Sequence, residues 1–248
     1  MRYKWIWSLV VVLIIAICLL IFLPLKEEQR TPSSLPNENQ LKKMILETGD
    51  VNIKSIFEQM AIDDNHIFLP HLSSDNQYGY SLLEWKKNKW EVTYVTSSGQ
   101  PLLWKITGGN KSESYFIWNL ETKYKIDHLT FFMNKHRNFR SGWGVDFYEP
   151  AIQIEEVVSI GDKPYGIYKA SDEWERIWKA TQIKVEEQEE DLFTFNNEEE
   201  GLHFGVKGYD KENNYVEPYN YYENSSSTSS GAQTEYVSIL DEWDGEQW

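Results

Sequence analysis

The chain is poor in cysteine, and its one cysteine, Cys18, lies within the first hydrophobic stretch. Residues 31–248 therefore offer no disulfide, no thiolate metal site and no cysteine nucleophile. An exported eukaryotic domain of this size more often carries disulfides. The shortage of cysteine thus favours a bacterial cell-surface protein that folds on its hydrophobic core alone.

The local motifs of the common enzyme classes are also missing. The sequence contains no nucleophile elbow, phosphate-binding loop, dinucleotide glycine pattern or zinc-protease helix. Its five histidines show no zinc-ligand spacing, and Pro70 separates His66 from His71. The acidic stretch from Asp210 has Tyr215 where a calcium-binding loop needs glycine. We therefore expect no cofactor, no metal site and no enzymatic activity.

Basic residues are scarce in the last quarter of the chain. Residues 31–181 hold twenty acidic and seventeen basic side chains, whereas residues 182–248 hold seventeen acidic and three basic ones. The two net charges are −3 and −14, and this acidity disfavours nucleic acid as a partner. The low-complexity stretch after Tyr219, which includes the serine run 225–230, buries little apolar surface. We expect it to be disordered.

The sequence does contain one long apolar stretch, from Trp5 to Leu25, in which Ser8 is the only polar side chain. A helix rises about 1.5 Å per residue, so this stretch spans roughly 30 Å, the thickness of a bilayer core. Trp5 and Trp7 lie at its N-terminal edge, where interfacial tryptophans are common, and Leu9 opens its central apolar run. No Ala-x-Ala-like cleavage site follows. We predict an uncleaved single transmembrane helix.

The orientation of this helix depends on its flanking charges. Arg2 and Lys4 precede it, and Lys26 and Arg30 follow it, so the positive-inside rule favours a cytoplasmic N-terminus only slightly. A long C-terminal domain can be exported regardless of charge. We predict a cell-membrane protein with its N-terminus in the cytoplasm and its C-terminal domain outside.

The segments after the anchor differ in composition. We expect a polar stalk over 26–40, an extracytoplasmic α+β domain over 41–210 and an acidic low-complexity tail over 211–248. The tail ends in a short amphipathic segment. The domain is expected to be a mostly antiparallel sheet with two short helices before it and one after it.

Apolar residues at helical spacing define these three helices. The first has an apolar stripe of Leu41, Met44 and Ile45. The second is expected to begin at an Asp50 N-cap and to carry four apolar residues: Ile53, Ile56, Phe57 and Met60. The third follows a Ser171 N-cap and has one apolar face of three residues: Trp174, Ile177 and Trp178.

Stretches rich in aromatic and β-branched residues predict strands between the helices. These stretches are 80–85, 90–95, 101–106, 115–120, 126–135, 152–160, 165–168 and 202–206. The polar residues 86–89 predict a hairpin loop between the first two. Such short strands with tight connections favour an antiparallel sheet.

A basic and aromatic cluster within an otherwise acidic protein is the first candidate site. It consists of Lys135, His136, Arg137 and Arg140, beside Trp143. One interpretation is a strand end that pairs with the protein's own acidic segment. The other is a patch for an anionic partner, such as a wall polymer or lipid headgroups.

The second candidate site is a docking motif near the C-terminus. Tyr236, Ile239, Leu240 and Trp243 share one face at helical spacing and could dock on a partner or back on the domain. Four strand tryptophans suggest either a sugar-binding platform or core packing, and we expect at least two to be core. They are Trp85, Trp90, Trp104 and Trp118.

The layout of one anchor, a cysteine-free domain and a polar tail resembles single-span surface proteins of Bacillus-like bacteria. We predict a membrane-anchored, non-enzymatic interaction module that binds a protein or an envelope polymer. The oligomeric state is left open. The alternative is an envelope hydrolase with two carboxylates facing each other across a cleft.

Overall fold

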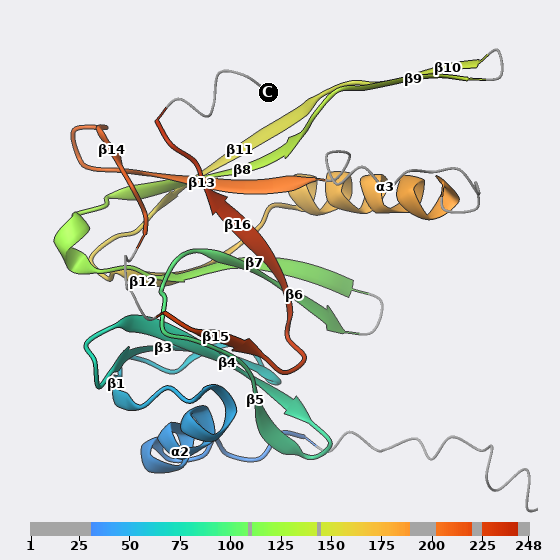
Figure 1. Cartoon of the computed structure of the whole chain (residues 1–248). Helices are drawn as coiled ribbons and strands as arrows, with labels where there is room; N and C mark the ends of the chain where they lie inside the picture. The colour runs from blue at the N-terminus through green and yellow to red at the C-terminus, as the bar shows by residue number, and fades with distance from the viewer. Residues whose placement is uncertain (1–30, 109–110, 143–144, 189–201, 220–224, 243–248) are drawn as a thin grey trace, which may run out of the picture.

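The computed structural model describes residues 31–108, 111–142, 145–188, 202–219 and 225–242. These residues form mostly β-sheet with two α-helices, which confirms the α+β class (Figure 1). The sheets are mostly antiparallel, as predicted. Among the described strands, only β13 (His203–Tyr209) and β16 (Gln233–Ile239) pair in parallel.

The predicted anchor lies outside the described residues, and with it Trp5, Trp7, Leu9 and Leu25. Within the part of the chain that the structure describes, no helix is both long enough and apolar enough to cross a membrane. The transmembrane helix therefore stays a prediction from the sequence.

One sheet of six described strands has the order β1-β3-β4-β5-β15, with β2 added to β3. Its strands are β1 (Ile53–Ile56), β2 (Met60–Asp63), β3 (His66–Ser73), β4 (Tyr78–Lys86), β5 (Lys89–Thr96) and β15 (Ser227–Ser229). The polar loop between β4 and β5 is confirmed as a hairpin turn. Lys87 and Asn88 have φ values of 51° and 62°. Two successive positive φ values are typical of the two-residue turn that matches strand twist.

Helix α2 (Glu38–Gly49) covers one face of this sheet (Figure 1). The Asn37 side chain accepts a hydrogen bond from the Gln40 backbone, and the Gln40 side chain accepts one from the Asn37 backbone. This capping box fixes where the helix begins. Leu41 and Ile45 are fully buried on its inner face, as the apolar stripe predicted.

The second predicted helix is wrong. Asp50 does not begin a helix but ends α2, in a left-handed conformation with φ 54°. Ile53 and Ile56 belong to β1 and Met60 belongs to β2, and both strands pair with β3. Phe57 lies between the two strands, and its N–H donates to the Pro70 carbonyl of β3 at 2.9 Å. The helical spacing of Ile53, Ile56 and Met60 was coincidental, because pairing with β3 decides the local structure there.

A second sheet of eight described strands has the order β11-β8-β13-β16-β6-β7-β12, with β14 added to β13. Its remaining strands are β6 (Leu102–Gly108), β7 (Lys111–Asn119), β8 (His128–Lys135), β11 (Ile152–Ser159), β12 (Tyr165–Lys169) and β14 (Tyr215–Val216). The sheet folds over on itself, so that its two edge strands come close. Glu156 of β11 accepts a hydrogen bond from the backbone N–H of Ser171, shortly after β12, at 3.2 Å.

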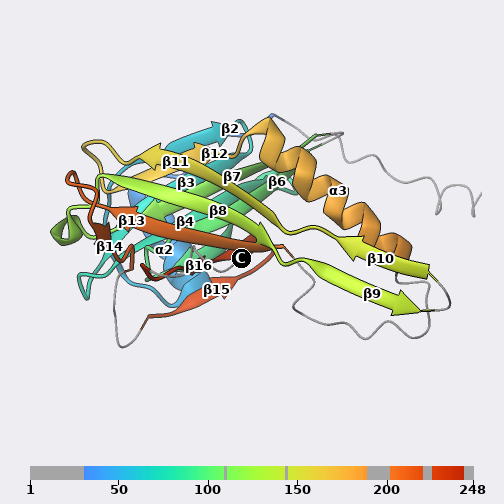
Figure 2. The same cartoon turned by 90° about the horizontal axis from the view of Figure 1, so that it is seen from above.

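Helix α3 (Asp172–Gln188) lies beside the opening of the folded sheet (Figures 1 and 2). The Ser171 hydroxyl accepts a hydrogen bond from the Trp174 backbone at 3.2 Å, so the predicted N-cap is confirmed. Trp174 and Trp178 are buried and contact Phe204 of β13. The helix thus fills the space between the two halves of the sheet.

Three apolar clusters hold these layers together. The first lies inside the folded sheet against α3, the second lies between α2 and the six-stranded sheet, and the third joins the two sheets. Trp90, Trp104 and Trp118 are all buried in these clusters, and Trp85 packs beside the second. Core packing of at least two of the four strand tryptophans is therefore confirmed.

The predicted disorder of the C-terminal tail is wrong for its described residues. The serine-rich stretch forms β15 along the edge of β5. Ser97 N–H donates to the Ser226 carbonyl at 3.0 Å, and Ser230 N–H donates to the Thr93 carbonyl at 2.8 Å. The expectation of disorder considered only apolar burial. An existing sheet edge supplies hydrogen-bond partners that a composition argument does not include.

The helical spacing predicted for the docking motif near the C-terminus is wrong as well, because its described residues belong to or follow strand β16. Val237 and Leu240 are buried, Ile239 packs against the core, and Tyr236 is exposed. Trp243 lies outside the described residues. This segment docks within the domain: β16 pairs with β6 through its first half and with β13 through its second.

Candidate interaction surface

Strands β8 and β11 continue beyond the body of the domain as a separate hairpin (Figures 1 and 2). It consists of β9 (Asn138–Gly142) and β10 (Val145–Glu149), paired antiparallel. The ladder between β8 and β11 ends where Lys135 pairs with Ile152. Pro150, which has no N–H to donate, lies between the two ladders. The hairpin is therefore joined to the body through a break in the hydrogen bonding.

The hairpin has no third strand within the described part of the chain. Strand β13 flanks β8, but its first residue, His203, pairs with Asn134 below the start of the hairpin. Beyond that point β9 and β10 pair only with each other. An isolated two-stranded hairpin is marginally stable in water at best. Among the described residues, the hairpin thus forms a two-stranded sheet of its own with little structural support.

Two aromatic side chains are largely exposed on this hairpin. Phe139 of β9 is 63% exposed, and Tyr148 of β10 is 66% exposed. The two residues are direct partners in the ladder, so their side chains lie on the same face. The hairpin therefore presents a small aromatic face to solvent.

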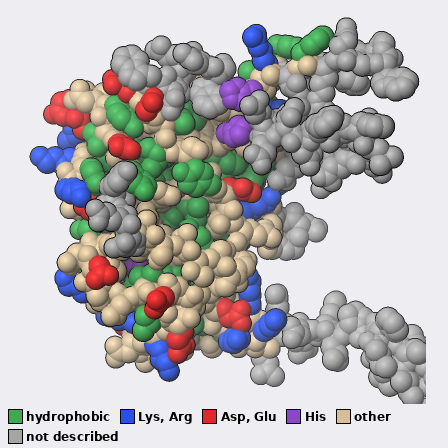
Figure 3. All heavy atoms as spheres, in the orientation of Figure 1, with side chains coloured by type: hydrophobic (Ala, Val, Ile, Leu, Met, Phe, Trp, Pro, Cys, Tyr) green, Lys and Arg blue, Asp and Glu red, His purple; other side chains and the backbone are tan. Residues whose placement is uncertain are grey.

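Basic and imidazole side chains surround the base of the hairpin. Lys135 is buried at the end of β8, while His136 and Arg137 are exposed just after it. His203 of β13 is also exposed, and its ring centroid lies 6.1 Å from that of His136. Figure 3 shows histidine side chains on the surface beside the departing hairpin.

Three consecutive members of the predicted basic cluster thus lie at the base of the hairpin: Lys135, His136 and Arg137. Arg140 lies in β9 opposite Phe147, and Trp143 lies outside the described residues. Both interpretations of the cluster stay predictions.

The sequence did not place His203, Phe139 and Tyr148 at the same site. The sequence predicted a strand over 202–206, which includes His203. The local sequence did not predict the register of that strand against β8. Phe139 and Tyr148 pair near the base of one hairpin. The sequence predicted no strand over 138–149, so this pairing was not expected.

No group of three potential ligands for a metal ion occurs among the residues that the structure describes. His136 and His203 alone fall short of the usual set for zinc. The calcium-like stretch is a tight turn between β13 and β14, in which the Asp210 carboxylate accepts hydrogen bonds from Asn214 and from the Glu212 backbone. The Asn214 side chain is the main cause of the lowered pKa of Asp210. These oxygens stabilise the turn.

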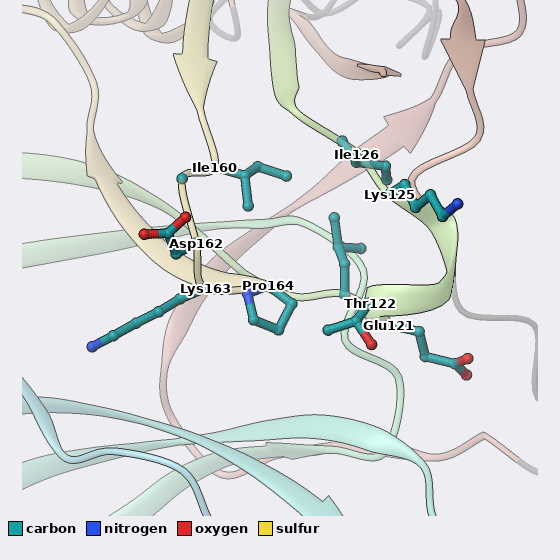
Figure 4. Close-up of a pocket in the computed structure, with 10 residues that line it drawn as sticks. Glu121, Thr122, Lys125, Ile126, Ile160, Asp162, Lys163 and Pro164 are labelled. Carbon is teal, nitrogen blue, oxygen red and sulfur yellow. The ribbon is translucent and has the colours of Figure 1, made fainter. Parts of the chain in front are cut away.

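A cavity of about 190 Å³ lies at the end of the folded sheet opposite α3 (Figure 4). Its lining includes two carboxylates, Glu121 and Asp162, as a hydrolase would require. Figure 4 shows both carboxylates directed away from the space between Thr122, Ile126 and Ile160. This cavity therefore gives no support to the hydrolase alternative.

No protein-family model matches the chain, and no curated protein or solved structure matches it either. Three features of the hairpin carry the functional argument: a two-stranded ladder without a third strand among the described residues, an exposed aromatic pair, and basic residues at its base.

Proposed function

We propose that this protein is a membrane-tethered, extracytoplasmic interaction module that binds a partner protein through the hairpin β9–β10. The observation that supports this most is the exposed pair of Phe139 and Tyr148 on a ladder without a third described strand. Packing against a partner would stabilise a hairpin that is otherwise only marginally supported.

The residue types on this surface are ones that protein interfaces favour. Aromatic residues and arginine are enriched at the centres of protein interfaces and carry much of their binding energy. Here Phe139 pairs with Tyr148 in the ladder and lies two residues after the exposed Arg137. Val157 and Tyr236 of the body are equally exposed, but neither has an exposed aromatic partner across its ladder. Val157 pairs with Thr130 and Tyr236 pairs with Leu102.

The predicted anchor would tether the domain to a membrane. Residues 26–37 separate the predicted anchor from α2, and an extended chain of that length reaches roughly 40 Å. The domain is therefore held within reach of the bilayer, with the hairpin at the end opposite α2 (Figure 1). A second membrane or envelope protein would meet it there at a high effective concentration.

Site-specific photo-crosslinking in living cells tests the proposed surface. We expect a photoreactive residue at Tyr148 or at Phe139 to give one discrete protein adduct of the full chain. Val157 and Tyr236 provide matched control positions, because they are 65% and 63% exposed, against 66% and 63% for the two hairpin residues. The control positions are expected to give no such adduct.

Three outcomes would contradict the proposal. Equal adducts from all four positions would mean that contact depends on exposure alone and that the hairpin has no special role. No adduct from either hairpin position would mean that it meets no partner. An adduct to a glycan polymer would replace the protein partner with an envelope polymer.

Protease treatment of intact cells tests the predicted orientation separately. We expect the C-terminal domain to be cut on intact cells, because the predicted topology places it outside. The break at Pro150 offers an accessible site beside the hairpin. If the domain survives on intact cells but is cut after lysis, it lies in the cytoplasm and the predicted orientation is wrong.

A further inference from the structure

We infer that the domain rests on the bilayer through a lysine groove that binds the phosphates of anionic lipid headgroups. The lysine groove lies between helix α2 and the turn that joins β4 to β5 (Figure 1). Lys43 of α2 and Lys89 line it, and Lys87 lies in the same turn. This inference rests on the membrane tether of the proposed function and specifies which face of the domain meets the lipid.

The segment that precedes α2 forms one wall of the lysine groove, which is open and about 550 Å³ in volume. The indole Nε1 of Trp90, on the β5 side, donates a hydrogen bond to the Ser33 carbonyl at 3.1 Å. Leu35 packs against the apolar cluster between α2 and the six-stranded sheet. Ser33 is thereby fixed to the body, so the connection to the predicted anchor is shorter than the predicted stalk.

The length of this connection places the lysine groove near the bilayer. Residues 26–32 separate the predicted anchor from Ser33. Seven residues reach at most roughly 25 Å when they are fully extended. Ser33 itself lines the groove, so the lysines lie beside the point from which the chain leaves for the lipid. This holds for either orientation of the anchor, because both sides of a bilayer present headgroups.

The ammonium groups of the lysine groove are available to a phosphate. The side chains of Lys43 and Lys89 are 75% and 66% exposed. Their ion pairs with Glu47 and Glu91 measure 3.7 and 2.8 Å. Exposed pairs of this kind contribute at most about 1 kcal/mol, so a lipid phosphate can replace the carboxylate. Lys87 is exposed and forms no ion pair among the described residues.

The charge of the whole protein favours contact through this groove. The chain carries 39 acidic and 24 basic side chains, a net charge of −15. An anionic surface repels such a protein as a whole but attracts each nearby lysine by about 1 kcal/mol. Three lysines beside the tether therefore select the face that meets the lipid.

Quenching of a fluorescent dye by lipid headgroups measures this contact. The full chain with Cys18→Ser carries the dye on Glu47→Cys, which lies in the lysine groove. It is placed in nanodiscs in which some headgroups bear a nitroxide quencher. One set of nanodiscs is phosphatidylcholine alone, and the other also contains phosphatidylglycerol. Glu212→Cys, in the turn between β13 and β14, is the control position, because it also replaces one exposed glutamate.

We expect the dye at position 47 to be quenched about threefold more strongly in the anionic nanodiscs, and the dye at position 212 to be quenched equally in both. The pair Lys87→Glu and Lys89→Glu is expected to abolish the difference, and Lys43→Glu, on a separate element, to reduce it. The pair Lys123→Glu and Lys125→Glu makes an equal change of charge before β8 and is expected to preserve the difference. Salt at about 1 M should remove it, because the Debye length is then only about 3 Å.

Three results would overturn the inference. Equal quenching at position 47 in both lipids would mean that headgroup charge plays no part. Equal losses with the two pairs of lysine substitutions would mean that only the net charge matters. Soluble polyphosphate, matched in phosphate to the anionic lipid, should leave the quenching in place, because the tether gives the lipid a higher effective concentration. Loss of quenching under this condition would assign the groove to an anionic polymer instead.

These results are distinguishable from those for the hairpin. Crosslinks from Tyr148 to a partner protein, together with equal quenching in both lipids, would reject only the lipid contact. The expected quenching without those crosslinks would reject the partner site and support the lipid contact. A full chain that does not co-purify with nanodiscs would reject the tether, and with it both proposals.

Discussion

Val237→Asp is expected to cost at least about 3 kcal/mol of folding stability, because it places an unpaired carboxylate in a closed apolar core. Val237 is 1% exposed and packs in the cluster inside the folded sheet. It pairs with Phe204 of β13 at the point where β16 passes from β6 to β13. The strand around it joins the two halves of the eight-stranded sheet.

The adjacent residue provides a matched control. Tyr236 is 63% exposed on the same strand, so Tyr236→Asp is expected to change stability by less than about 1 kcal/mol. Urea denaturation of the full chain in detergent micelles, followed by tryptophan fluorescence, measures both variants. The buried Trp174 and Trp178 lie in the same cluster as Val237 and report its disruption.

This comparison decides between the structure and the expectation from composition. A disordered tail would make both substitutions equally harmless, because neither side chain would be packed. Small, equal effects at Val237 and Tyr236 would therefore show that the C-terminal segment is not part of the core. A large effect at Val237 alone would confirm that the acidic last quarter of the chain completes the fold.

Sequence reasoning succeeded where a local pattern and the tertiary fold agree. The Ser171 cap and the spacing of Trp174 and Trp178 define a helix without further information, and α3 follows them. The polar residues at 86–89 likewise suit a tight turn, and the positive φ values of Lys87 and Asn88 complete it. In both segments the local sequence preference is sufficient to predict the structure.

It failed where a distant partner determines the structure. Ile53 and Ile56 fit a helix as well as a strand, and pairing with β3 selects the strand. The serines of β15 have no strong preference, but the edge of β5 accepts their backbone groups. The local sequences of β1 and β15 do not predict these partner strands, because β3 and β5 lie elsewhere in the chain.

The candidate site shows the same division. The basic cluster could be predicted from the sequence because Lys135, His136 and Arg137 are consecutive. The exposure of Phe139 could not be predicted, because it depends on where β13 begins against β8. Composition shows which side chains are available, and strand register shows which of them remain in solvent.

Acidification from pH 7 to pH 5 is expected to remove about 2 kcal/mol of folding stability through one side chain, His71, since each pKa unit corresponds to about 1.4 kcal/mol. His71 of β3 is fully buried between the two sheets. Its Nε2 lies 3.1 Å from the Ser81 hydroxyl. Burial lowers the pKa of His71 from 6.5 to about 3, because a charged imidazole loses its solvation there.

The sign follows from comparing proton binding in the folded and unfolded chains. Below pH 6.5 an unfolded His71 takes up a proton, while the folded one stays neutral until about pH 3. The unfolded state therefore binds more protons, and stability falls as the pH decreases through this window. Neighbouring Tyr80 adds no charge, because burial raises its pKa far above neutral.

Two variants isolate this effect when urea denaturation is repeated at pH 7 and pH 5. His71→Gln cannot titrate, so its stability is expected to fall by about 2 kcal/mol less than that of the wild type over this range. Ser81→Ala removes the hydrogen-bond partner but leaves the buried imidazole. It is expected to lower stability by about 1 kcal/mol at both pH values and to keep the wild-type pH dependence. If His71→Gln retained that dependence, the ring would have to be open to solvent protons, and the tight contact between the two sheets would be wrong.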